Sequence, residues 1–142
     1  MKKNLTRQSL PEEDYLVLLG AALCTFNSNN QFVIENMLRS GYNLKDWYHL
    51  IDLPSGKLFE ELKKTNLCEH DNAIQLFHEI IKMRNRIIHS FQITENGKQR
   101  LGTKEKINDG NHQDVITEEY LRKFLKMNEW LHFELHSIRE HL

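Results

Sequence analysis

The sequence has 142 residues and a mass of 17.0 kDa, so we expect residues 1–142 to form a single domain. Its composition, 39% hydrophobic and 27% charged with 6 glycines and 2 prolines, excludes collagen, low-complexity tails and disordered acidic chains. The two cysteines are too few for a disulfide scaffold and favour a reducing, cytoplasmic location. No apolar run reaches the ~20 residues of a membrane span, so we expect no membrane association.

The charge is unevenly distributed along the chain. The formal net charge is −1, but residues 82–106 carry seven basic side chains against two acidic ones, a local charge of +5. A basic stretch in an otherwise acidic protein can attract a phosphate chain to one place. A solvated loop that happens to be basic explains the same pattern. The seven basic residues are Lys82, Arg84, Arg86, Lys98, Arg100, Lys104 and Lys106.

The first third of the chain predicts a long helix. Ser9 is suited to be its N-cap, with Glu12 as the capping-box partner. Apolar residues then recur at helical spacing from residue 15 to residue 26. The polar run at residues 27–30 interrupts this pattern, so the helix either resumes after it or gives way to a second helix, which ends near Gly41.

Two short helices and a second long helix are predicted next. The first short helix begins at Asn43, and the Pro-Ser-Gly sequence at residues 54–56 breaks it before a second short helix at residues 58–64. Asp71 is suited to cap a long helix that extends to about Phe91.

A polar excursion separates that helix from the last one. From residue 92 to residue 115 the helical pattern lapses and turn signals accumulate, and we expect a ragged hairpin through Ile93 and Leu101. Thr117 is suited to cap a final helix in which Trp130 anchors the core. The predicted fold is therefore an all-α, up-down bundle of four to five helices with a polar excursion before the last helix.

The long helix at residues 71–91 contains an unusual arginine. Arg84 lies within an apolar stripe at helical spacing, where a lone buried charge costs several kcal/mol, about 3 or more, unless it is paired. It must therefore pair with a buried carboxylate, extend to water, or face a cleft or subunit interface. Asn85 and His89 follow it, one turn apart on the same side of the helix. The stripe is formed by Phe77, Ile80, Ile81, Arg84, Ile88 and Phe91.

The segment from Arg84 to His89 reads Arg-Asn-Arg-Ile-Ile-His. It resembles the Arg-polar-x-x-x-His signature of the HEPN domains, small helical bundles of which many are metal-independent endoribonucleases in toxin–antitoxin, antiphage and RNA-processing systems. The resemblance rests on this short motif and on the helical architecture of the whole chain, because nothing outside residues 84–89 aligns. It implies a HEPN-like helical bundle.

The resemblance also implies roles for three residues. His89 would transfer protons, and Arg84 would bind the scissile phosphate. Asn85 would orient either His89 or the phosphate by hydrogen bonding. These roles agree with general chemistry, since histidine titrates near neutral pH and arginine stays charged and grips phosphate oxygens in pairs. RNA supplies its own nucleophile, the 2′-OH, so the reaction requires no metal and no cofactor, and it leaves a 2′,3′-cyclic phosphate and a 5′-hydroxyl.

A composite site in a homodimer is the arrangement that the resemblance implies. Arg84 and His89 would point about 140° apart on a straight helix, so one chain alone does not bring them together unless the helix ends near Ile88. The expected partners are a second copy of the chain, an RNA substrate and a cognate antitoxin of the nucleotidyltransferase type. The expected RNA-binding residues outside the motif are Lys82, Arg86, Lys98, Arg100, Lys104 and Lys106.

Other interpretations stay open. The chain is alternatively a catalytically inactive HEPN-like module that binds RNA, a nucleotide or a partner protein, or an unrelated helical adaptor with Arg84 in a structural ion pair. His132 and His136, four residues apart, have the spacing of two zinc ligands, but no third strong ligand is evident, and an exposed polar face is the favoured interpretation.

Overall fold

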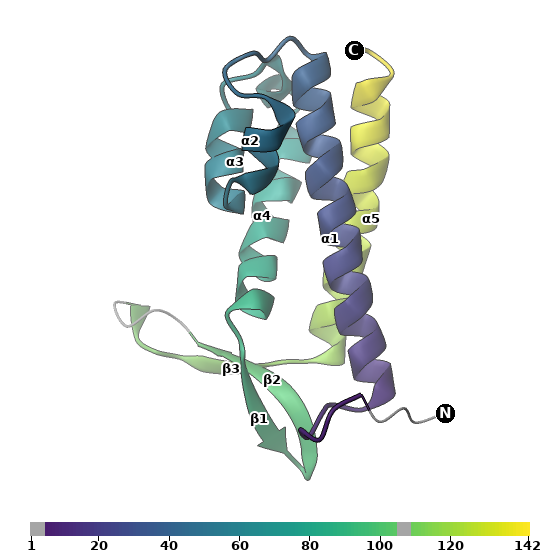
Figure 1. The fold of residues 1–142 in the computed structure, drawn as a ribbon, viewed down its shortest axis with the longest axis vertical. Coiled ribbons are helices and arrows are strands. Elements are labelled where there is room, and N and C mark those ends of the chain that lie inside the picture. The colour runs from purple at the N-terminus through teal and green to yellow at the C-terminus, as the bar shows by residue number, and fades with distance from the viewer. Residues whose placement is uncertain (1–4, 105–108) are drawn as a thin grey trace.

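The fold of this protein is mostly helical, with one small sheet (Figure 1). The computed structural model describes residues 5–104 and 109–142. Within these ranges, no helix has the length and apolar character needed to cross a membrane. The elements, in chain order, are α1 (Glu13–Arg39), α2 (Trp47–Asp52), α3 (Ser55–Leu62), the 3-10 turn η1 (Asn66–Glu69), α4 (Asp71–Ile88), β1 (Phe91–Glu95), β2 (Lys98–Lys104), β3 (Gln113–Ile116) and α5 (Glu118–Arg139).

Helix α1 continues through the polar run at residues 27–30 without a break. The run is tolerated because Asn29 is buried and its Nδ2 donates to Asn128 on α5, to the backbone oxygen at 2.8 Å and to Oδ1 at 3.0 Å. The helix begins at Glu13, with Glu12 in the N-cap position and no side-chain cap, so the predicted cap at Ser9 is wrong.

Helices α1 and α5 run in the same direction, and α4 runs opposite to both (Figure 1). Two asparagines of α1 fix the register of α1 against α5. Asn29 bonds to residue 128, and Asn36 bonds to the backbone oxygen of Leu135, seven residues further along both helices. Phe26 and Phe124 stack between α1 and α5 with their ring centroids 6.4 Å apart. Buried polar groups that are paired in this way specify one register among the several that apolar packing alone would permit.

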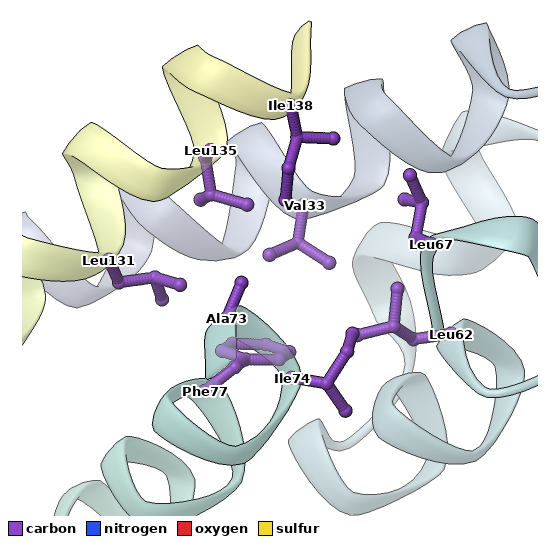
Figure 2. Close-up of a pocket in the computed structure, with 9 residues that line it drawn as sticks. All are labelled: Val33, Leu62, Leu67, Ala73, Ile74, Phe77, Leu131, Leu135 and Ile138. Carbon is purple, nitrogen blue, oxygen red and sulfur yellow. The ribbon is translucent and has the colours of Figure 1, made fainter. Parts of the chain in front are cut away.

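The core between the three long helices is closely packed. The void shown in Figure 2 has a volume of about 10 Å³, at or below the ~10–15 Å³ that a water molecule requires. Nine apolar side chains line it: Val33, Leu62, Leu67, Ala73, Ile74, Phe77, Leu131, Leu135 and Ile138.

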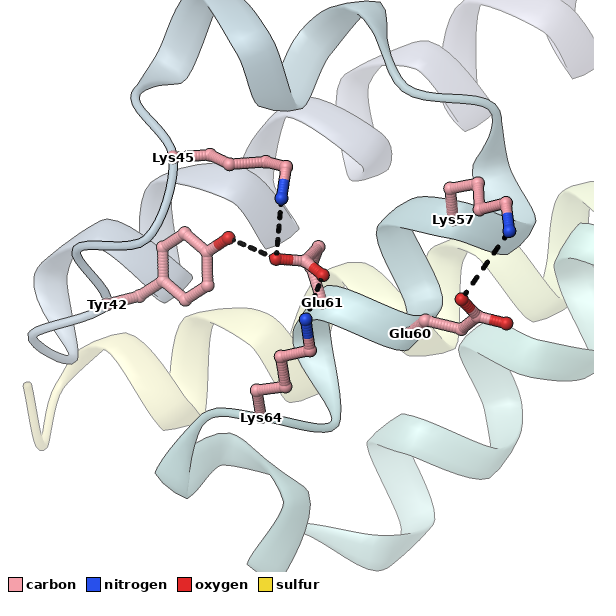
Figure 3. Close-up of polar contacts among 6 residues, drawn as sticks. All are labelled: Tyr42, Lys45, Lys57, Glu60, Glu61 and Lys64. Carbon is pink, nitrogen blue, oxygen red and sulfur yellow. Dashed lines mark hydrogen bonds and ion pairs between the residues drawn. The ribbon is translucent and has the colours of Figure 1, made fainter.

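A buried carboxylate of α3, Glu61, binds the segment that precedes α2 (Figure 3). It accepts hydrogen bonds from Lys64 Nζ at 2.6 Å, Tyr42 Oη at 2.6 Å and Lys45 Nζ at 3.3 Å. The hydrogen bonds from Lys64 and Tyr42 lower the pKa of the Glu61 carboxyl to about 2, and burial together with Glu61 raises the pKa of Tyr42 to about 12. Helix α2 begins at Trp47 and its N-cap is Asp46, so the predicted start at Asn43 is wrong.

The polar excursion folds into an antiparallel sheet of three strands in the order β1-β2-β3, so the all-α prediction is wrong for this segment. The predicted hairpin is present, with Ile93 opposite Arg100. Its two-residue turn has positive φ at Asn96 (52°) and Gly97 (76°), the geometry of a type I′ turn. Gly102 lies under the Phe91 ring, where an added Cβ would be 3.0 Å from a ring carbon.

Helix α5 begins as predicted, because the Thr117 side chain accepts a hydrogen bond from the backbone nitrogen of Tyr120 at 3.0 Å. Trp130, however, is 52% exposed, so the prediction that it anchors the core is wrong. The buried positions of α5 are taken by smaller side chains on the opposite side of the helix, including Leu131 and Leu135.

Candidate active site

The apolar stripe of α4 continues past Arg84 to Ile87 at the end of the helix. Phe77, Ile80 and Ile81 are buried as predicted, but the next buried position is Ile87. Ile88, which the spacing had placed in the core, is 44% exposed, and α4 ends there and not at Phe91. The last turn of α4 therefore leaves an apolar side chain beside the motif accessible to a partner.

Arg84 is half-buried and has no carboxylate partner among the described residues. Its guanidinium lies 5.2 Å from the centroid of the Phe26 ring, and its Nη1 donates a long hydrogen bond of 3.4 Å to Asn85 Oδ1. The aromatic face stabilises the cation by about 0.5–2 kcal/mol. Most of its five N–H donors therefore stay available for an anion.

His89 occupies the C-cap of α4, with φ −96° and ψ 23°, and its backbone nitrogen donates to Asn85 O at 3.0 Å. The residue is exposed, and its imidazole forms no hydrogen bond with the described residues. Because the helix ends at Ile88, the straight-helix angle no longer fixes the direction of this side chain. No hydrogen bond links Arg84 to His89 within the described part of one chain.

A cleft of about 320 Å³ lies beside Arg84. One wall is α1, which contributes Phe26 and three amide side chains. The other wall is the end of α2 and the start of α3, with apolar residues and Ser55. The three amides are those of Asn27, Asn30 and Gln31. The cleft thus combines one cation, several amides and an apolar wall.

The sequence analysis did not identify Asn30. Its Oδ1 is the one buried side-chain oxygen or nitrogen without a hydrogen-bond partner in the part of the chain that the structure describes. An unpaired buried acceptor costs about 1–3 kcal/mol, so native proteins rarely keep one. The available signal was the polar run at residues 27–30 within an otherwise apolar helix pattern.

Two of the predicted RNA-binding residues lie away from the cleft. Lys82 and Arg86 are each two residues from Arg84, which places them about 160° around the axis of α4. Both are exposed, and Lys82 Nζ pairs with Glu79 at 3.2 Å. These two cations therefore lie on the side of α4 opposite to Arg84.

Three of the predicted RNA-binding residues of the excursion lie on β2, and two of these three pair with Glu12, the N-cap residue of α1. Lys98 Nζ lies 3.1 Å from Glu12 Oε1, and Arg100 Nη2 lies 3.9 Å from Glu12 Oε2. Arg100 also covers the Tyr15 ring at 4.8 Å. The shared carboxylate reduces their positive potential. Lys104 donates to Asn111 Oδ1 at 2.7 Å, and Lys106 lies outside the described residues.

His132 and His136 pack on an aromatic residue. Their ring centroids are 4.5 Å apart, and both rings meet the Phe32 ring edge-on, at 5.9 Å and 4.8 Å. Across residues 5–104 and 109–142, no group of three or more His, Cys, Asp or Glu side chains is placed to hold a metal ion. Aromatic packing accounts for this pair.

In comparisons with known proteins, no family model, no curated protein and no solved structure matches this chain. The likeness to HEPN domains thus rests on residues 84–89 and on the mostly helical architecture.

Proposed function

We propose that this protein is a metal-independent endoribonuclease of the HEPN type. The observation that carries the proposal is the environment of Arg84, a half-buried guanidinium at the end of α4 with no carboxylate partner in the described chain. Asn85 contacts it, and the exposed imidazole of His89 follows at the helix terminus. A cation that no anion of the described residues neutralises, in the same motif as an exposed imidazole, suits a phosphodiester substrate.

The reaction uses the nucleophile that RNA contains. The 2′-OH attacks the adjacent phosphorus and loses its proton to the His89 imidazole, and the bond between phosphorus and O5′ breaks as a proton returns to the 5′-oxygen. Arg84 holds two phosphate oxygens and stabilises the charge that develops on them. The products are a 2′,3′-cyclic phosphate and a 5′-hydroxyl.

The proposed active species is a homodimer in which the two α4 termini meet and form two composite clefts. Ile88 and Phe91, 44% and 37% exposed, supply apolar surface beside the motif for such a contact. A two-fold contact is self-complementary, so it brings each motif close to its copy near the axis. In this arrangement His89 of one chain serves Arg84 of the other, which removes the need for the two residues to meet within one chain.

The setting that the resemblance suggests is a toxin or antiphage-defence module. An active ribonuclease damages its own cell unless a partner restrains it. The proposed partner is an antitoxin of the nucleotidyltransferase type.

A nuclease assay in chelator tests the activity. Purified protein is incubated with a fluorescently labelled RNA in excess EDTA, and the product termini are determined by mass spectrometry. We expect cleavage that leaves cyclic phosphates, and we expect His89→Ala to lower the rate by about 10²-fold or more, since proton transfer contributes about 10²–10⁴.

The matched control is His141→Ala, an exposed histidine at the far end of α5, which should cleave at the wild-type rate. Cleavage that EDTA stops would contradict the proposed mechanism. RNA that is retained but stays intact would favour the inactive binding module over the enzyme.

A further inference from the structure

The cleft beside Arg84 has unmet hydrogen-bonding groups of both kinds. Arg84 offers several N–H donors, and its one hydrogen bond, to Asn85, is long at 3.4 Å. Asn30 offers a buried Oδ1 acceptor that has no hydrogen-bond partner among residues 5–104 and 109–142. Both residues line the same cleft, yet they do not bond to each other. A ligand that satisfies the two must therefore be an anion and also carry a hydrogen-bond donor.

Simple anions meet only half of this requirement. Sulfate and a carboxylate are acceptors only, so they can pair with the guanidinium but leave the Asn30 oxygen unsatisfied. Inorganic phosphate keeps an O–H donor at neutral pH, but it is too small to fill a cleft of about 320 Å³. A nucleotide has both groups in one molecule, a phosphate and a base with N–H donors. The volume of the cleft, about 320 Å³, is at the lower end of the roughly 300–1,000 Å³ of small-ligand sites, which suits one nucleotide and not two.

We propose that this cleft is the nucleobase subsite of the ribonuclease, which rests on the proposed function. The phosphate of one nucleotide binds the Arg84 guanidinium, and its base enters between α1 and the start of α3. Asn30, whose oxygen no hydrogen bond holds, turns to accept a hydrogen bond from the exocyclic amino group of the base. Apolar side chains of the opposite wall, Ile51 and Pro54, cover the face of the base.

This arrangement predicts a preference among bases. Adenine, cytosine and guanine each carry an exocyclic amino group, whereas uracil has only a ring N–H and two carbonyl oxygens. The donor on the Watson–Crick edge of uracil, N3–H, lies between two carbonyl oxygens, and these repel the Asn30 oxygen and weaken the hydrogen bond that N3–H would donate to it. Recognition by a site with a buried polar group discriminates because the wrong ligand leaves that group unpaired.

Calorimetric titration with the four 3′-nucleoside monophosphates and with inorganic phosphate tests the subsite. We expect 3′-AMP, 3′-CMP and 3′-GMP to bind the wild-type protein about fivefold more tightly than 3′-UMP or phosphate, the value of about one neutral hydrogen bond. Asn30→Leu keeps the branched shape of the side chain and removes the acceptor, so it should erase this preference. Its thermal unfolding midpoint should not fall, because the lost acceptor had no partner in the free protein. Asn72→Leu, on an exposed turn of α4, is the matched control and should keep the preference.

Equal affinity for all four nucleotides and for phosphate would overturn the inference, because it would show an anion site without a base pocket. So would an Asn30→Leu variant that unfolds at a lower temperature and still ranks the bases as the wild type does. The ranking by the wild-type protein is decisive even if the variant fails to fold. Base-selective binding by a protein that cleaves no RNA would contradict the proposed function and support the subsite. Cleavage in EDTA without base-selective binding would support the proposed function and contradict the subsite.

Discussion

The phenol of Tyr15 donates a 2.6 Å hydrogen bond to the backbone oxygen of Ile116, a residue 101 positions later in the chain. The same phenol oxygen accepts a 3.2 Å hydrogen bond from the backbone nitrogen of Leu101. Tyr15 is fully buried, and the Arg100 guanidinium covers its ring at 4.8 Å. One side chain near the start of α1 therefore holds both β2 and β3, and it fixes the sheet against the helices.

Tyr15→Phe should destabilise the protein by about 1–3 kcal/mol. The substitution keeps the ring but leaves the Ile116 oxygen and the Leu101 nitrogen without their partner, and unsatisfied buried groups have a cost of this size. Urea unfolding followed by circular dichroism measures the change. Tyr48→Phe is the matched control, because that residue is 74% exposed and should show no change. An unchanged midpoint for Tyr15→Phe would mean that water replaces both bonds.

The Glu61 cluster predicts a loss of stability in acid. The pKa of the Glu61 carboxyl is lowered from an ordinary 4.5 to about 2, so its ionised form stabilises the folded state. This stabilisation is complete above pH 4.5 and is lost as the pH falls through about 2. Because Lys45 and Lys64 are partly exposed to water, we expect a contribution of about 1 to 2 kcal/mol.

Glu61→Gln tests this prediction, since the amide stays neutral across the range. The free energy of unfolding of the variant should be lower than that of the wild type at pH 6, and the difference should shrink as the pH falls from 4.5 toward 2. Glu60→Gln is the matched control, because Glu60 is exposed and its contact with Lys57 is 3.9 Å. A difference between Glu61→Gln and the wild type that does not depend on pH would contradict the assignment.

The apolar spacing predicted the helices, and the exposed sheet largely escaped it. Helix periodicity reports burial on one face, and the three long helices each bury such a face. Strand β1 buries little, and the two buried residues of β2, Gly102 and Thr103, are adjacent, so neither strand has the alternation that marks a strand. The hairpin was predicted from turn signals, Asn96-Gly97 among them. Trp130 was misassigned because its spacing in α5 fits either side of the apolar stripe.

The candidate site was predicted at the level of its motif but not of its surroundings. The stripe of α4 passes from Ile81 to Ile87 and leaves Ile88 exposed, a choice between adjacent isoleucines that spacing alone does not decide. Asn30 could not be identified as an unpaired acceptor, because pairing depends on where α1 meets α2 and α3 in space. Contacts between distant segments are not encoded in local spacing.

Arg84→Met separates a functional arginine from a structural one. Methionine keeps an unbranched apolar chain over Phe26, and no carboxylate in the described chain loses a partner, so the free energy of unfolding should change by less than about 1 kcal/mol. Cleavage of RNA should fall by about 10²-fold or more because the phosphate loses its cation. If Arg84 were half of a buried ion pair, as the adaptor interpretation requires, the variant would lose about 3–5 kcal/mol.

Arg139→Met is the matched control for the change in stability. Arg139 pairs with Glu35 at 2.8 Å and covers the Phe32 ring at 4.2 Å, so its loss removes an ion pair that Arg84 lacks. We expect Arg139→Met to unfold more easily than Arg84→Met and to cleave RNA at the wild-type rate. The reverse order of stability would show that Arg84 has a structural role.

Mixing two inactive variants tests whether the site is composite. If each cleft takes Arg84 from one chain and His89 from the other, a dimer of one Arg84→Met chain and one His89→Ala chain contains one intact cleft and one doubly altered cleft. Random exchange of equal amounts makes half of the dimers mixed, so about a quarter of all clefts, and of the wild-type activity, should return. Light scattering at micromolar concentration should show a dimer throughout. A monomer, or a mixture as inactive as its components after complete subunit exchange, would mean that Arg84 and His89 do not act across a shared interface.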